Sequence, residues 1–459
     1  MAIGLLLVAS GPTAAMEIDT GFDILRDPDT TIEGFHRLYV GQAFGAGLSF
    51  GQAIYSAALG DGGGAFFWGY EAKKSWVLTD GLGIHATGFV GGGGGASQVV
   101  GDGLMLRLGA GLEVAVADGW AITAGLSHIA IDGGDEAAPA LSLGVSRSVE
   151  MEGAALPIRG AALRVSSLHY ADSQNRNGAA QPALSLVGTE FSFAGGPTGE
   201  YFVGADGAAR GGEGYMQIMA GLRGRARSGQ LSAFAEAAAG FGGGGQVDTA
   251  GGLLVQAGVG AGLDLTAGLR IEGLVARHVA PQSGTAATLA MARLTRVFGS
   301  LEAREVQQGL QRWRFATGVS QQFPNDGFRI PFSGRHGRPF LQESSVDLLL
   351  SDRIYITGNA QTVLGGDAAG YAIGLIGLGY ELPLSERVSV SGEVHLGAAG
   401  GGSVAASGGA IYALRGEIDY QLDSHIFASL GLGRMATVSG GGMGPTFVSL
   451  GLKFPFATR

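Results

Sequence analysis

Large apolar residues alternate with small or polar residues along several long segments of the chain. In the clearest segment, apolar residues occupy every second position from Leu104 to Val116, and Arg107, Gly109 and Glu113 stand between them. A period of two places the apolar side chains on one face of a β-strand and the small or polar ones on the other. The segment exceeds the usual strand of about five or six residues and matches the roughly nine to eleven that a tilted strand needs to cross a bilayer. The pattern therefore predicts membrane-crossing strands.

The same arrangement occurs three times. Segments that begin at Gly91, Gly242 and Gly400 each contain a glycine cluster, a polar loop, a long alternating strand, a tight turn and a second alternating strand. Equivalent positions are roughly 150 residues apart, which is too long for the unit of a solenoid. Because the alternation has the same phase in all three copies, the sequence predicts an all-β protein built from three repeats.

The connections between the predicted strands alternate in length. Tight turns such as "ADG" and "TAG" follow one end of the strands, whereas longer segments such as "IDGGDEAAP" and "TVSGGGMGP" follow the other end. At the C-terminus, "TFVSLGLKFPFATR" places apolar residues at alternate positions up to Phe456. Both features resemble outer-membrane β-barrels, which have short periplasmic turns and long external loops. The resemblance extends over about residues 35–456 and concerns the architecture, without a specific family.

This resemblance implies a large antiparallel transmembrane β-barrel of about 22–24 strands. An alternative that the pattern leaves open is three tandem small barrels of about eight strands each. The expected repeats span about residues 35–150, 151–300 and 301–456.

The N-terminal residues predict an exported protein. An apolar run from Ala2 to Ala9 precedes a Gly-Pro breaker and small residues, which is typical of a secretory signal peptide. We therefore expect a signal peptide at residues 1–15 and an N-terminal periplasmic segment at residues 16–34, before the barrel begins.

Glycine accounts for 86 of the 459 residues and lacks the fixed period of a collagen. The run from Gly91 to Gly95 has the composition of a phosphate-binding loop. Such a loop needs a following helix, and a P-loop also ends in Gly-Lys-Ser/Thr. Here a predicted strand follows and no lysine ends the run. We therefore expect the glycines to allow sharp bends and tight curvature where strands close a barrel.

Charge and composition exclude several classes of protein. The formal net charge is −10 and no cluster of Lys and Arg occurs, which argues against nucleic-acid binding. The lack of cysteine fits an envelope protein. None of the eight histidines has the spacing of a metal site, so we expect no metal and no cofactor.

The polar faces of the predicted strands carry charges of both signs. An unpartnered buried charge is costly, so the mixture predicts either a water-filled lumen or ion pairs that fill a narrow barrel. The lumen-lining candidates are Arg107, Glu113, Gln256, Asp264, Arg415, Glu417 and Asp419.

Two further segments contain candidate site residues. In "GRHGRPF", Arg335, His336 and Arg338 form either a site for an anionic solute or lipopolysaccharide phosphates, or a solvated loop. Around His169, the sequence faintly resembles the His-x-Ser signature of outer-membrane lipid A deacylases. Ala171 stands where that family has its serine nucleophile, so we expect no enzymatic activity.

The sequence thus predicts a Gram-negative outer-membrane channel, porin-like, that passes small polar solutes or an exported polymer. The alternative is a surface or structural envelope protein, such as an adhesin, scaffold or lattice subunit, and a lipid-modifying enzyme is less favoured. Expected partners are outer-membrane lipid, lipopolysaccharide, the barrel-assembly machinery and further copies of the chain in a homo-oligomer.

Overall fold

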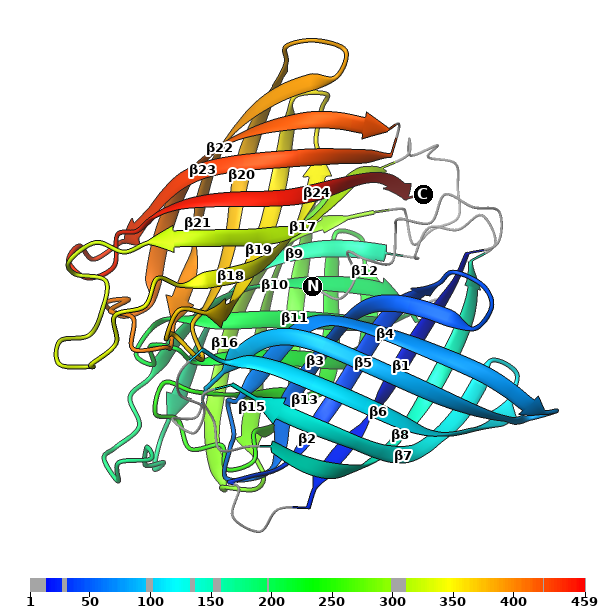
Figure 1. Ribbon diagram of the computed structural model, residues 1–459. Coiled ribbons are helices and arrows are strands. Elements are labelled where there is room, and N and C mark those ends of the chain that lie inside the picture. Colours follow the sequence, from blue (N-terminus) through cyan, green and yellow to red (C-terminus); the bar gives the residue numbers. More distant parts are fainter. Residues whose placement is uncertain are drawn as a thin grey trace.

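The protein consists of three closed β-barrels. The computed structural model describes residues 14–26, 31–95, 102–132, 137–151, 158–195, 198–298, 311–423 and 425–458. In these residues the chain forms 24 antiparallel strands, which close into three sets of eight. In Figure 1, where the colours follow the sequence, the first barrel is blue to cyan, the second is green, and the third is yellow to red.

The strands of each barrel are consecutive in the chain. Barrel 1 comprises β1 (Ala14–Leu25), β2 (Ile32–Ala43), β3 (Leu48–Gly60), β4 (Phe66–Thr79), β5 (Leu82–Gly94), β6 (Leu104–Ala117), β7 (Trp120–Ile131) and β8 (Ala137–Met151). Barrel 2 comprises β9 (Ile158–Tyr170), β10 (Leu184–Ala194), β11 (Gly199–Arg210), β12 (Met216–Ser228), β13 (Leu231–Gly243), β14 (Leu253–Thr266), β15 (Leu269–Ala280) and β16 (Thr285–Val297). Barrel 3 comprises β17 (Gln311–Phe323), β18 (Phe340–Leu349), β19 (Ile354–Gly365), β20 (Ala372–Pro383), β21 (Val388–Gly400), β22 (Ala410–Asp423), β23 (Ile426–Thr437) and β24 (Thr446–Thr458).

Each barrel is closed by pairing of its first strand with its last. Thr20 of β1 lies opposite Val145 of β8, and Ala316 of β17 lies opposite Lys453 of β24. Closure pairs the backbone groups that a sheet edge would leave open. Within the described residues, no helix has the length and hydropathy needed to cross a membrane.

The structure decides between the two architectures that the sequence left open. The all-β class, the three repeats and the strand number are confirmed, and the chain forms three tandem small barrels rather than the single large barrel that we favoured. Each set of eight strands closes on itself, at the size for which side chains just fill the interior.

The prediction of a periplasmic segment at residues 16–34 is wrong, because β1 lies within it and pairs with both β2 and β8. In β1, Glu17, Asp19 and Asp23 alternate with outward apolar residues, and these acidic residues are partners for cations in the barrel. Residues 1–13 of the predicted signal peptide lie outside the described residues, and residues 14 and 15 begin β1.

The predicted apolar faces point outward. Leu108 is 71% exposed and Val259 is 66% exposed, whereas their inward neighbours Arg107 and Gln256 are buried. The outward surfaces of all three barrels therefore carry exposed aliphatic side chains around charged interiors.

The two ends of each barrel differ in the length of their connections. At one end, called here the turn end, β6 and β7 are joined by Asp118 and Gly119, and Gly119 has φ +70°, which glycine adopts without strain. At the other end, called the long-loop end, the connections include residues 171–183 and 324–339. The predicted alternation of short and long connections is thus present in the fold.

Candidate functional site in the barrel interiors

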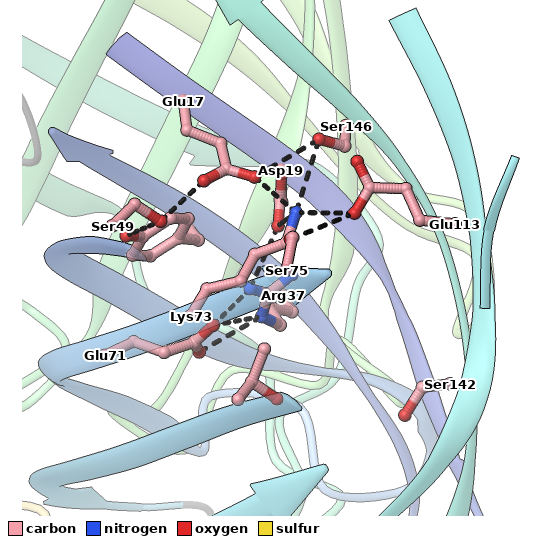
Figure 2. A network of polar contacts seen from close by, with 12 residues as sticks. Glu17, Asp19, Arg37, Ser49, Glu71, Lys73, Ser75, Glu113, Ser142 and Ser146 are labelled. Carbon is pink, nitrogen blue, oxygen red and sulfur yellow. Dashed lines mark hydrogen bonds and ion pairs between the residues drawn. The ribbon is translucent and has the colours of Figure 1, made fainter. Parts of the chain in front are cut away.

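The interior of barrel 1 holds a network of ion pairs centred on Lys73 of β4 (Figure 2). The Lys73 ammonium lies 3.2 Å from Asp19 Oδ2 and 3.4 Å from Glu113 Oε2, and it also contacts the Glu17 carboxylate. Arg37 Nη2 lies 3.3 Å from the same Asp19 oxygen. These side chains come from β1, β2, β4 and β6, so closure of the barrel brings together charges that are far apart in the sequence.

A second ion pair lies nearer the long-loop end of barrel 1. Arg107 donates from Nε to Asp23 Oδ2 at 2.6 Å and from Nη2 to Asp23 Oδ1 at 3.0 Å. Its Nη1 donates to the Thr87 hydroxyl at 2.7 Å. Arg107, a predicted lumen-lining residue, therefore has all its guanidinium nitrogens bound within the barrel.

The interior of barrel 2 contains a network of arginines and glutamates beside buried apolar side chains such as Phe234 and Leu274. Arg293 Nη1 lies 3.0 Å from Glu190 Oε2, and its Nη2 lies 2.9 Å from Glu236 Oε2. Arg223 contacts the same two carboxylates at 2.8 and 2.9 Å. Arg293 is 1% exposed, so this network is closed to bulk solvent.

The interior of barrel 3 contains a network that extends from Arg415 to Lys453. Arg415 Nη2 lies 3.0 Å from Glu343 Oε1 and 3.3 Å from Glu417 Oε1. Lys453 Nζ lies 3.0 Å from the other Glu417 oxygen and 2.9 Å from Asp419 Oδ2. Glu417 thus links the two cations.

The three interiors differ in their balance of charge. In the ion pairs of barrel 2, six carboxylates face six guanidinium groups: Glu190, Glu200, Asp206, Glu236, Asp264 and Glu272 against Arg164, Arg223, Arg225, Arg227, Arg270 and Arg293. Barrel 1 has five carboxylates against three cations: Glu17, Asp19, Asp23, Glu71 and Glu113 against Arg37, Lys73 and Arg107. Barrel 3 has six against three: Glu343, Asp347, Glu381, Glu393, Glu417 and Asp419 against Arg314, Arg415 and Lys453.

Hydrogen bonding follows the same division. Buried carboxylate oxygens without a hydrogen-bond partner occur on Asp19 in barrel 1 and on Asp347 and Asp419 in barrel 3. Among the described residues, barrel 2 has no such oxygen. In the ion pairs of barrels 1 and 3, carboxylates therefore outnumber cations, and some carboxylate oxygens lack a hydrogen-bond partner.

Small cavities lie beside the ion pairs of barrels 2 and 3. One cavity of about 10 Å³ is lined by Arg223, Arg225 and Glu272 of barrel 2. Another of about 10 Å³ lies beside Asp347 and Arg415 of barrel 3. A space of this size is close to the minimum that holds one water molecule. Within the described residues, no cluster of three or more His, Asp or Glu side chains is arranged to hold a metal ion.

The structure places the predicted lumen-lining residues in three separate interiors. Barrel 1 contains Arg107 and Glu113, barrel 2 contains Gln256 and Asp264, and barrel 3 contains Arg415, Glu417 and Asp419. Gln256 donates to Glu236 at 3.3 Å, and Asp264 accepts from Arg270 at 2.5 Å. These residues point inward and bind one another or their neighbours, but they do not share one continuous lumen.

The predicted anion-binding residues lie in the loop 324–339 of barrel 3. Arg335 forms an ion pair with Asp367, the Arg338 guanidinium lies 5.8 Å from the centre of the Phe323 ring, and His336 is exposed. In the same loop, Arg329 donates to the carbonyl oxygens of three glycines at 2.8–2.9 Å, and burial lowers the pKa of its guanidinium. The loop thus uses several of its cations for contacts within the protein.

The segment that resembled a deacylase signature does not assemble a catalytic site. His169 is exposed, and its Nε2 is 3.0 Å from Ser167 Oγ. Ser173 Oγ donates to the Ala286 carbonyl at 3.4 Å. Glu190 lies in the interior of barrel 2, bound by three arginines. The three side chains therefore have separate partners.

The sequence did not predict that some polar residues on outward strand faces are buried between barrels. Gln52 and Ser344 stand on outward strand faces, yet both are buried, and Gln52 Nε2 donates to Ser344 Oγ at 3.0 Å between barrels 1 and 3. Small and polar residues are typical where membrane-spanning elements pack together. A polar residue on the outward face of a strand is therefore the sequence feature that indicates such a contact between barrels.

Comparisons with known proteins assign no family to the chain. No protein-family model matches the chain, and no curated protein matches it. Similar solved structures include the ferric enterobactin receptor PfeA of Pseudomonas aeruginosa (12% identity, 98% of this chain and 81% of that chain, TM-score 0.29). They also include the siderophore receptor PirA of Acinetobacter baumannii (10% identity, 98% and 81%, TM-score 0.31) and OccK11 of P. aeruginosa (10% identity, 97% and 96%, TM-score 0.24). The class of this protein, an all-β chain of three closed barrels, is defined by its own strand pairing.

Proposed function

We propose that the protein is an integral outer-membrane protein whose three barrels each cross the bilayer. The outward surface supports this proposal. Aliphatic side chains on all three barrels are exposed there, and contact of this much apolar surface with water would cost free energy. Examples are Leu126 at 67%, Val259 at 66% and Leu450 at 61% exposure. A soluble protein rarely exposes contiguous apolar surface of this extent, because the transfer of apolar surface from water into an apolar environment is favourable.

Localisation is tested by cell fractionation together with gel migration before and after heating. We expect the protein in the outer-membrane fraction, with faster migration of the unheated sample because closed barrels resist unfolding by detergent. Recovery in a soluble fraction, or a circular dichroism spectrum dominated by helix, would contradict the proposal.

Within the membrane we propose a structural role, as an envelope scaffold or surface protein. The observation that carries this proposal is that ion pairs and packed apolar side chains occupy the barrel interiors, and that the cavities beside the ion pairs of barrels 2 and 3 measure about 10 Å³. A polar solute larger than water cannot pass a space of this size. Surface contacts with lipopolysaccharide through Arg335, His336 and Arg338, and insertion by the barrel-assembly machinery, belong to the same proposal.

A narrow ion channel is the second candidate function. It is favoured by the charged residues of the interiors, among which carboxylates outnumber cations in the ion pairs of barrels 1 and 3. Rearrangement of these ion pairs would open a path through the barrel. Small cations would pass this path in preference to anions, because rings of acidic side chains select cations. The two candidates share the membrane location and differ in conductance.

Recording from purified protein in a planar bilayer separates the candidates. The structural proposal predicts no stepwise conductance. The channel predicts steps that prefer cations, and Asp419→Asn in barrel 3 would reduce this preference, whereas Asp352→Asn, at an exposed turn, would leave it unchanged. Cation-selective steps that respond to Asp419→Asn would remove the structural proposal as the principal function.

A further inference from the structure

Six loops at the long-loop end meet in a closed ring of glycines, which we call the glycine junction. Two loops come from each barrel: the one between its third and fourth strands and the one between its fifth and sixth strands. The six glycines of the junction are Gly64, Gly95, Gly214, Gly244, Gly370 and Gly401.

Three contacts of the ring cross from one barrel to another. A Cβ atom placed on Gly243, the neighbour of Gly244, would lie 2.6 Å from Gly64 N, between barrels 2 and 1. A Cβ on Gly94, the neighbour of Gly95, would lie 2.7 Å from Gly370 N, between barrels 1 and 3.

The third crossing is between barrels 3 and 2, where a Cβ on Gly400 would lie 2.6 Å from Gly214 Cα. Each distance is shorter than real Cβ contacts, and each involves backbone atoms. A residue larger than glycine would therefore separate the barrels at all three crossings.

The other three contacts of the ring lie within a barrel. A Cβ on Gly95 would meet the carbonyl oxygen of Gly64 in barrel 1. The same relation holds between Gly244 and Gly214 in barrel 2, and between Gly401 and Gly370 in barrel 3. Contacts within and between barrels therefore alternate around the ring, and the ring closes after three barrels.

The arrangement has pseudo-threefold symmetry. The equivalent glycines before the fourth strand of each barrel, Gly64, Gly214 and Gly370, have φ values of +94°, +84° and +84°. In each case the loop before the fourth strand of one barrel contacts the loop after the fifth strand of the next. An interface that joins two different patches in this way forms a closed ring when the rotation closes, as between identical subunits.

Hydrogen bonds at the same loops support the interface independently of the glycines. Gly63 N donates to Ala250 O at 2.6 Å between barrels 1 and 2, and Gly370 N donates to Gly93 O at 2.7 Å between barrels 3 and 1. Acidic side chains join the loops of barrels 2 and 3 and those of barrels 1 and 3.

The Glu213 carboxylate of barrel 2 accepts from Ala406 N at 2.9 Å and from Gly408 N at 3.1 Å in barrel 3. Asp102 Oδ1 of barrel 1 accepts from Gly366 N at 2.8 Å and Asp367 N at 2.7 Å in barrel 3. Loops of one barrel thus supply hydrogen-bond partners for backbone groups of the next.

We propose that the surface of each barrel at the glycine junction is a subunit interface whose partner is another barrel of the same fold, so that the chain is a fused trimer. The junction, and not the two covalent connections between the barrels, then holds the three barrels together. Because all three interfaces are occupied within one chain, the ring leaves no junction surface free for a further copy.

The full chain tests this inference when protease sites are inserted between β8 and β9 and between β16 and β17. After folding and cleavage of both connections, we expect the three pieces to remain together at the mass of the intact protein on an unheated gel and by native mass spectrometry. Heating should release three barrels of about one third of the mass. Release of separate folded barrels without heating would overturn the proposal.

Substitution at the ring provides the second arm of the experiment. In the cleaved protein, Gly64→Val is expected to increase the released fraction about tenfold or more, which corresponds to about 1.4 kcal/mol. Gly81→Val is the matched control, because Gly81 has a similar φ of +83° at a turn of the same barrel and no heavy atom within 4 Å of the added Cβ. Equal release by both variants would contradict the proposal.

A milder variant covers the case in which Gly64→Val does not fold. Glu213→Ala removes two hydrogen bonds to barrel 3 and adds no atoms, so we expect increased release of barrel 3 with all three barrels still folded. Glu386→Ala, at an exposed turn of barrel 3, is its control. Two results together would exclude the junction as the interface. These are a cleaved protein without substitutions that separates into barrels without heating, and a Glu213→Ala variant that releases barrel 3 to the same extent. Because none of these readouts involves conductance or localisation, the outcome is independent of the proposed function.

Discussion

Replacement of Arg293 by methionine is expected to lower the free energy of unfolding by about 3–5 kcal/mol, because it removes one partner from a buried network of ion pairs. Arg293 contacts Glu190 and Glu236 at 3.0 and 2.9 Å and is 1% exposed. Methionine fills much of the same volume, so the loss arises mainly from the uncompensated carboxylates. Urea titration of the protein in phospholipid vesicles, followed by far-ultraviolet circular dichroism, measures the change.

The control for this variant is Arg296→Met on the same strand. Arg296 is exposed at the turn end, and its hydrogen bond to the Gly268 carbonyl is 3.3 Å long. An exposed contact of this kind contributes little, so we expect a change of about 1 kcal/mol or less. Similar losses in the two variants would show that the interior network is hydrated and contributes no more than a surface contact.

Replacement of Val259 by arginine is expected to cost about 2–4 kcal/mol in a bilayer, because the side chain lies in the middle of β14 and faces outward. Val259 is 66% exposed on the barrel surface, where lipid would surround it. The measurement is the same urea titration in vesicles, repeated in detergent micelles, where a deformable environment should reduce the cost.

Leu265→Arg is the matched control for lipid depth. Leu265 lies on the same face of β14, one residue from its end, and is 49% exposed. Close to the membrane interface the expected cost falls to about 0–1 kcal/mol. Equal tolerance of arginine at positions 259 and 265 would show that the barrel surface does not face a bilayer.

The alternation of side chains determined much of the fold because it is a local property. A period of two fixes which side chains of a strand share a face, and it correctly assigned Leu108 and Val259 outward and Arg107 and Gln256 inward. The same reasoning missed β1, since Glu17, Asp19 and Asp23, which alternate with outward residues, fell in the segment predicted to precede the barrel.

The interior site could be predicted only in part. Charges of both signs on the inward faces indicated either ion pairs or water, and the structure contains ion pairs. The partners themselves were not predictable, because Arg293 and Glu190 are separated by 103 residues and meet only when β9 and β16 pair.

By itself, the sequence determined the strand class, the three repeats, the outward faces and the alternation of turns and loops, since each depends on residues close together in the chain. Only the tertiary structure decided how the strands close. Pairing of β8 with β1, rather than with β9, depends on hydrogen bonds between strands more than 100 residues apart, and no local pattern encodes that choice. The role of the glycines was decided at the same level. In the sequence, Gly64 and Gly370 look like glycines of simple turns. Both positions require glycine because the backbone of a neighbouring barrel occupies the space that a Cβ would need.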